Sequence, residues 1–124
     1  MRAIRCLIVD DNESFLQAAE VLLERQGLPV IGVALTSSEA RRLAKELQPS
    51  VVLVDISLGD ESGIDLAGQL AQDGLPDGAA VILISTRAYE EVAELIAQTS
   101  AVGFLPKEDL SADAIRGLLD GRWG

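Results

Sequence analysis

Short apolar runs that end abruptly at polar residues constrain the fold of this 124-residue chain more than any other feature of its sequence. There are three: Ile4–Val9 before Asp10-Asp11-Asn12, Val51–Val54 before Asp55, and Val81–Ile84 before Ser85-Thr86. The runs are too short to span a bilayer, and they lack the polar alternation of a strand with one solvated face. They therefore predict strands of a parallel sheet that helices cover on both faces.

Helical patterns alternate with these runs. Apolar residues recur at helical spacing from Phe15 to Leu23, and Gly27 follows where a helix would end. Thr36-Ser37-Ser38-Glu39 matches a capping box, which opens a helix that reaches about Leu47 before Pro49. Further segments are expected as strands over Pro29–Ala34 and Ala101–Leu105 and as helices over Gly63–Ala71, Tyr89–Gln98 and Ser111–Leu119. Five βα units of this length predict one doubly wound α/β domain over residues 1–124.

Composition removes several classes of function. Hydrophobic residues make up 48% of the chain, enough for one core. Ten basic against twenty acidic side chains leave a net charge of −10, so direct binding of nucleic acid is not expected. The single Cys6 excludes an internal disulfide, and the absence of histidine argues against zinc, haem and histidine-based catalysis. Neither a leader peptide nor a membrane span is predicted, so we expect a cytoplasmic protein.

Polar side chains follow the predicted strands where a ligand would bind, because ligands of an open parallel sheet lie outside the carboxyl ends of its strands. They are Asp10, Asp11, Asp55, Ser85 and Lys107. Two carboxylates about 5 Å apart repel by roughly 3 kcal/mol at an effective dielectric near 20, so positive charge is required. Lys107 supplies one charge, and Mg²⁺, which prefers oxygen ligands, would supply the rest. Such a site can hold a phosphoryl group while a carboxylate attacks it.

Four motifs, in order along the chain, resemble those of the receiver domain of bacterial two-component response regulators, the CheY-like superfamily. They are Leu7-Ile8-Val9-Asp10-Asp11-Asn12, Val52-Leu53-Val54-Asp55-Ile56 with Gly63 downstream, Val81-Ile82-Leu83-Ile84-Ser85, and Gly103-Phe104-Leu105-Pro106-Lys107. The resemblance spans essentially the whole chain. It implies a flavodoxin/CheY-like sheet of five parallel strands in the order 2-1-3-4-5, and a phosphoacceptor signalling domain rather than an enzyme.

The resemblance also implies the chemistry of the site. It makes Asp55 the acceptor of a phosphoryl group from the phosphohistidine of a histidine kinase or phosphotransfer protein. Asp10, Asp11, Asp55 and the main-chain carbonyl of Ser57 would bind Mg²⁺. Lys107 would pair with Asp55 and then with the phosphoryl oxygens. Phosphorylation and slow dephosphorylation would both be self-catalysed.

A two-state switch follows from the same resemblance. Ser85 would form a hydrogen bond with the phosphoryl group, and Phe104 would turn from exposed to buried. The surface formed by the fourth helix, fifth strand and fifth helix would change and could support a homodimer. The segment Phe104–Leu110 is similar to the corresponding segment of receivers that precede helix-turn-helix domains. The switch is therefore expected to control a C-terminal DNA-binding effector domain or a separate downstream protein.

Two residues depart from the family pattern. Gly59 stands four residues after the acceptor, where the family usually has proline, and it is expected to loosen the loop from Ser57 to Ser62. Thr86 is bulkier than the small residue that often follows Ser85, and it is expected to narrow the approach to the phosphoryl group. Both departures bear on phosphoryl lifetime, and neither removes a residue that the chemistry requires.

Three other functions of this architecture agree less well with the residues. A receiver-like module that dimerises or docks without phosphorylation is the main alternative, although the intact acidic residues, hydroxyl and lysine argue against it. An aspartyl phosphohydrolase commonly has a second aspartate two residues after the nucleophile, where this chain has Ser57. A flavin carrier needs a phosphate-binding loop after the first strand, and the acidic segment Asp10–Glu13 would repel a phosphate.

Overall fold

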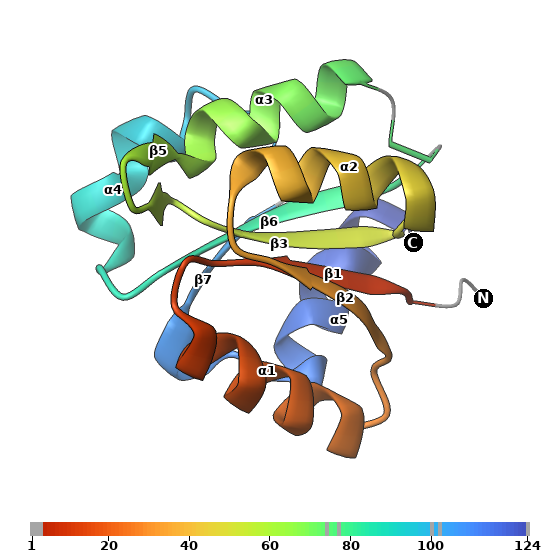
Figure 1. Ribbon diagram of the computed structural model, residues 1–124. Coiled ribbons are helices and arrows are strands. Elements are labelled where there is room, and N and C mark those ends of the chain that lie inside the picture. The colour runs from red at the N-terminus through yellow and green to blue at the C-terminus, as the bar shows by residue number, and fades with distance from the viewer. Residues whose placement is uncertain (1–3, 74, 77, 100, 102, 124) are drawn as a thin grey trace.

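A five-stranded parallel sheet lies at the centre of the molecule, with helices on both faces (Figure 1). The computed structural model describes residues 4–73, 75, 76, 78–99, 101 and 103–123. In this part of the chain the strands of the large sheet are β1 (Cys6–Val9), β2 (Val30–Ala34), β3 (Val51–Asp55), β6 (Ala80–Ser85) and β7 (Gly103–Pro106). Their order is β2-β1-β3-β6-β7 and every pair is parallel. Counted along the chain this is 2-1-3-4-5, which confirms the predicted doubly wound fold.

The helices divide between the two faces and enclose two apolar clusters. They are α1 (Glu13–Arg25), α2 (Ser37–Leu47), α3 (Gly63–Asp73), α4 (Tyr89–Ile96) and α5 (Ala112–Trp123). Residues of α1 and α5 share one cluster with the sheet, and residues of α2, α3 and α4 share the other. Strands β1, β3 and β6 contribute residues to both clusters because their side chains alternate between faces. Among the described residues no helix combines the length and apolar character needed to cross a membrane.

Several predicted boundaries shift by one or two residues. The sequence predicts that the fifth strand of the sheet begins at Ala101, but it begins at Gly103, and Val102 lies outside the described residues. Helix α3 runs two residues beyond the predicted Ala71, and α4 ends two residues before the predicted Gln98. Apolar periodicity fades at helix ends, so it locates an element better than it locates its last turn.

Local capping explains where the first two helices begin and where α1 ends. Asn12 accepts a hydrogen bond from the Phe15 N–H at 3.1 Å and starts α1. The predicted capping residue Thr36 accepts one from the Glu39 N–H at 3.2 Å, which confirms the start of α2. After α1, Gly27 adopts a φ of 83°, a left-handed conformation that glycine takes at little cost.

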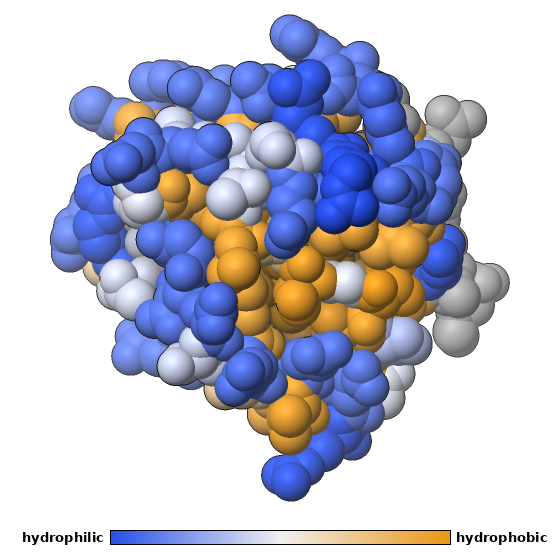
Figure 2. Space-filling model, in the orientation of Figure 1, coloured by the Kyte–Doolittle hydropathy of each residue, from blue (hydrophilic) through white to orange (hydrophobic). Residues whose placement is uncertain are grey.

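Strand β2 forms one edge of the sheet and is less covered than the strands inside it. Ile31, Gly32 and Val33 are half-buried, whereas every residue of β1 and β3 is buried. Figure 2 shows an apolar area on the surface, where the edge strand β2 lies between α1 and α2 in Figure 1. The central strands β1 and β3 are thus shielded on both faces. Their parallel pairing fixes the position of their carboxyl ends relative to each other.

Gly63 provides a sharp test of how closely α3 packs on the end of β3. A Cβ atom at Gly63 would lie 1.8 Å from the carbonyl oxygen of Asp55, while a Cβ at Gly68 in the same helix would meet nothing within 4 Å. We expect Gly63→Ala to lower the free energy of unfolding by about 1–3 kcal/mol through overpacking. Gly68→Ala should raise it by about 0.5–1 kcal/mol. Urea denaturation measures both, and equal effects would contradict this account.

The buried Cys6 thiol predicts a component of stability at high pH. Burial raises the pKa of Cys6 from its ordinary 9.0 to about 12. The unfolded chain therefore binds fewer protons than the folded one between these values, and the free energy of unfolding falls as the pH rises through them. Cys6→Ala should lack this component, so its stability should fall less than that of the wild type between about pH 8 and about pH 10.5. Identical pH dependence of the two proteins in urea denaturation would refute the prediction.

Candidate functional site

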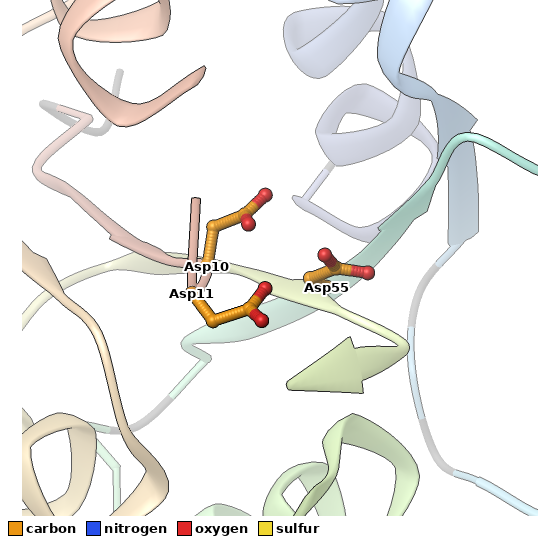
Figure 3. Close-up of side chains that lie close together, drawn as sticks. All are labelled: Asp10, Asp11 and Asp55. Atoms are coloured by element: carbon orange, nitrogen blue, oxygen red, sulfur yellow. The ribbon is translucent and has the colours of Figure 1, made fainter. Parts of the chain in front are cut away.

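Three carboxylates meet at the carboxyl edge of the sheet (Figure 3). Asp10 and Asp11 directly follow β1, and Asp55 is the last residue of the neighbouring strand β3. One carboxylate oxygen from each residue lies within 4.8 Å of the other two. The predicted convergence of these residues is therefore present, because parallel pairing of Val9 with Val54 brings the two strand ends to the same level.

Lys107 places a positive charge among these acids. Its Nζ lies 2.6 Å from Asp10 Oδ2 and 3.1 Å from Asp55 Oδ2. The lysine side chain is only 13% exposed, so water screens these ion pairs little. Burial alone would disfavour the ammonium, but hydrogen bonds and attraction from Asp10 and Asp55 hold the pKa of Lys107 above its ordinary value. The lysine is therefore charged at neutral pH.

Asp55 is a buried acid at the end of β3, next to the loop that follows this strand. Burial raises the pKa of Asp55, while the Ser57 N–H, which donates to Asp55 Oδ1 at 3.0 Å, and the Lys107 ammonium lower it in part. The net direction is upward. One oxygen of Asp55 thus faces a main-chain donor and the other faces the lysine.

Asp10 is completely buried, and its two oxygens have different partners. Oδ1 accepts from the Asn12 N–H at 2.9 Å, whereas Oδ2 lies 2.6 Å from the Lys107 ammonium. This close ion pair with Lys107 compensates for the loss of water around the second oxygen. A buried carboxylate oxygen beside two further carboxylates is a donor set that suits a hard divalent cation such as Mg²⁺.

The segment after Asp55, for which Gly59 predicts a loosened loop, forms a paired hairpin. Strands β4 (Ser57–Leu58) and β5 (Glu61–Ser62) pair antiparallel around the two central residues Gly59 and Asp60. Gly59 has a φ of 61°, the conformation that glycine provides at the first central position of a tight hairpin turn. Proline, fixed near −65°, could not adopt it, so the family's usual residue does not fit this turn.

A contact that the sequence patterns did not reveal ties this hairpin to α2. Both oxygens of Glu61 accept hydrogen bonds from Ser37, one from the N–H at 3.0 Å and one from the hydroxyl at 2.8 Å. These bonds lower the pKa of the Glu61 carboxyl. The two residues lie in separate βα units, and only the tertiary structure brings them together.

Ser85 and Phe104 lie on β6 and β7, the two strands that follow β3 in the order of the sheet. Ser85 is buried at the end of β6, and its Oγ accepts a hydrogen bond from the Arg87 N–H at 3.0 Å. The following Thr86 is exposed. Phe104 is half-buried in β7, with its ring centroid 6.0 Å from that of the exposed Tyr89. The aromatic pair joins the first turn of α4 to β7.

Phe15 is a second residue whose position escaped prediction. The helical pattern assigned it to the apolar face of α1, and it does pack at the margin of the cluster shared with α5. Its ring centroid also lies 4.5 Å from Lys107 Nζ. The sequence does place Phe15 about one helical turn after the acidic end of β1. That spacing alone does not identify Lys107 as the neighbour of the ring.

Comparison with known proteins adds sequence relatives to this geometry. A family model described as response regulator receiver domain matches residues 6–118. The transcriptional regulatory protein LiaR of Bacillus subtilis is 35% identical over 117 residues, which cover 91% of this chain and 54% of that protein. LnrK of the same organism is 34% identical over 90% of this chain and 50% of its own length. The chain spans about half the length of these curated relatives.

Solved structures agree with the sequence relatives. The signal receiver domain of the putative response regulator NarL from Mycobacterium tuberculosis superposes with a TM-score of 0.82 at 26% identity, covering 100% of this chain and 99% of that one. With a family model that matches nearly all of the sequence and a receiver domain that matches all of the structure, the chain belongs to the receiver domain family of two-component response regulators.

Proposed function

We propose that the chain accepts a phosphoryl group on Asp55 from the phosphohistidine of a histidine kinase or phosphotransfer protein, and that this modification switches its surface. The observation that carries the proposal is the contact of one ammonium with two buried carboxylates beside a third acid. A further observation supports it. A response regulator from Burkholderia pseudomallei, 28% identical over 94% of this chain and superposing with a TM-score of 0.78, was solved with a phosphorylated aspartic acid and a calcium ion.

Asp55 is the nucleophile in the proposed transfer. One of its carboxylate oxygens forms a bond to phosphorus as the bond from phosphorus to the donor's imidazole nitrogen breaks, and the leaving imidazole keeps the electron pair. Lys107 stabilises negative charge on the phosphoryl oxygens from its position beside Asp55. The Ser57 N–H keeps the acceptor carboxylate oriented. Residues 1–124 act as one receiver unit in this proposal.

Magnesium is the cofactor that the proposal requires. Asp10, Asp11, Asp55 and the main-chain carbonyl of Ser57 would hold it, and when bound it would neutralise charge on the phosphoryl oxygens. Asp10, which is buried beside the Asp11 and Asp55 carboxylates, fits this role. Asp11 is exposed and so leaves one side of the site open to solvent.

The proposed switch uses Ser85 and Phe104. The Ser85 hydroxyl, whose oxygen now accepts from the Arg87 N–H, donates to the phosphoryl group, which draws the loop after β6 inward. Phe104, now half-buried against Tyr89, turns further into the interior. The face formed by α4, β7 and α5 then changes, and a homodimer or an output partner responds to it. The relatives' names as transcriptional regulators favour a DNA-binding output domain.

Phosphorylation at one aspartate is directly testable. Wild type incubated with acetyl phosphate and Mg²⁺ should gain the mass of one phosphoryl group in intact mass spectrometry, and a chelator should prevent the gain. Asp55→Asn should gain nothing because it lacks the acceptor carboxylate. Asp60→Asn is the matched control, since it removes an exposed acid from the same hairpin and should be labelled like wild type. Labelling of Asp55→Asn would show that another residue is the acceptor, and no labelling of wild type would favour a module that acts without phosphorylation.

Removal of the ammonium should slow the transfer without removing the acceptor. We expect Lys107→Met to reduce the rate of labelling by acetyl phosphate by about a hundredfold, the cost typical of losing one donor to a developing anion. Lys45→Met provides the control, because Lys45 is the chain's other lysine and is exposed on α2. A rate in Lys107→Met close to that of Lys45→Met would show that the ammonium has no part in the reaction.

A further inference from the structure

The Phe15 ring is held in place by the start of α1. The backbone N–H of Phe15 donates to the side chain of the capping residue Asn12, which follows the acidic pair Asp10-Asp11 after β1. The ring is half-buried and packs at the margin of the apolar cluster between α1, α5 and the sheet. The cap and the cluster therefore fix this aromatic group close to the carboxyl edge of the sheet.

The Phe15 ring contacts the ammonium that joins the two buried acids. Lys107 Nζ lies 4.5 Å from the centroid of Phe15, well within the range of a cation–π interaction. The same ammonium lies 2.6 Å from Asp10 Oδ2 and 3.1 Å from Asp55 Oδ2. Because the lysine side chain is nearly buried, the interaction is stronger than at an exposed site.

The carboxylates alone do not determine where the ammonium lies. A lysine has a flexible stem and a compact charge, and here it is closer to Asp10 than to Asp55. An ammonium free to move fully onto Asp10 would be poorly placed for charge that develops beside Asp55. An aromatic face in contact with the ammonium provides a third attractive partner, from an element other than β1 or β3.

We propose that Phe15 is a positioning residue that holds the Lys107 ammonium between Asp10 and Asp55, so that it meets the phosphoryl oxygens during transfer. This inference rests on the proposed function. Its chemical basis is the electron-rich face of the ring, which an aliphatic side chain of similar size lacks. A purely structural role for Phe15, as an apolar residue of α1, would be fulfilled by leucine.

The test compares Phe15→Leu with the aromatic variant Phe15→Tyr. Phe15→Leu should slow labelling of Asp55 by acetyl phosphate about threefold to tenfold, while Phe15→Tyr should stay within about twofold of wild type. In the Lys107→Met background, Phe15→Leu should cause no further loss, since the ring acts through the ammonium. Thermal melting of each variant confirms that the folded proteins are compared.

Two results would overturn the inference while leaving the proposed function intact. One is labelling of Phe15→Leu at the wild-type rate or faster, and the other is an equal loss from Phe15→Leu with and without Lys107. If wild type takes no phosphoryl group, the proposed function fails instead. The two failures are therefore distinguishable.

Wild-type protein alone provides a spectroscopic test that needs no variant to fold. The ε-methylene protons of Lys107 should resonate upfield of those of Lys45 because they lie near the Phe15 ring, whereas Lys45 is exposed. Equal chemical shifts for the two lysines would contradict the contact and overturn the inference, whatever the rate of phosphorylation.

Discussion

A buried ammonium shared by two carboxylates is the interaction on which the geometry of this site depends. Moving a charged group out of water costs several kcal/mol even after relaxation, so none of the three groups is stable there without the others. Asp10 and Asp55 come from neighbouring strands, and Lys107 comes from the 3₁₀ turn η1 (Lys107–Asp109) that follows β7. The cluster therefore fixes three strand ends relative to one another, and the parallel register of the sheet supplies the common edge at which they meet.

The fold and the polar residues of the site follow from local patterns. Short apolar runs indicate the central strands, and the rule that parallel strands present ligands at their carboxyl ends predicts that Asp10, Asp55 and Lys107 meet. The position of the Phe15 ring over Lys107 could not be predicted in this way. Apolar periodicity assigns a residue to a helix face, but it does not state which distant side chain meets that residue at the margin of the core.

The hairpin after Asp55 shows a second limit of prediction from sequence. From the sequence alone, Gly59 predicts a loosened loop because glycine is conformationally permissive. In the structure the same permissiveness allows a φ of 61° and closes a tight turn, which gives the segment from Ser57 to Ser62 a defined shape. Whether a glycine loosens or tightens a loop depends on pairing of the residues around it, here Leu58 with Glu61, and that pairing has no strong local pattern in two-residue strands.

The double hydrogen bond between Glu61 and Ser37 has a mechanical consequence. The hairpin is covalently continuous with the acceptor strand at one end, and through Glu61 it is fastened to the beginning of α2 at the other. Displacement of the hairpin must carry the first turn of α2 along or break both bonds at once. Helix α2, which precedes the acceptor strand in the chain, is thus also linked through Ser37 and Glu61 to the segment that follows Asp55.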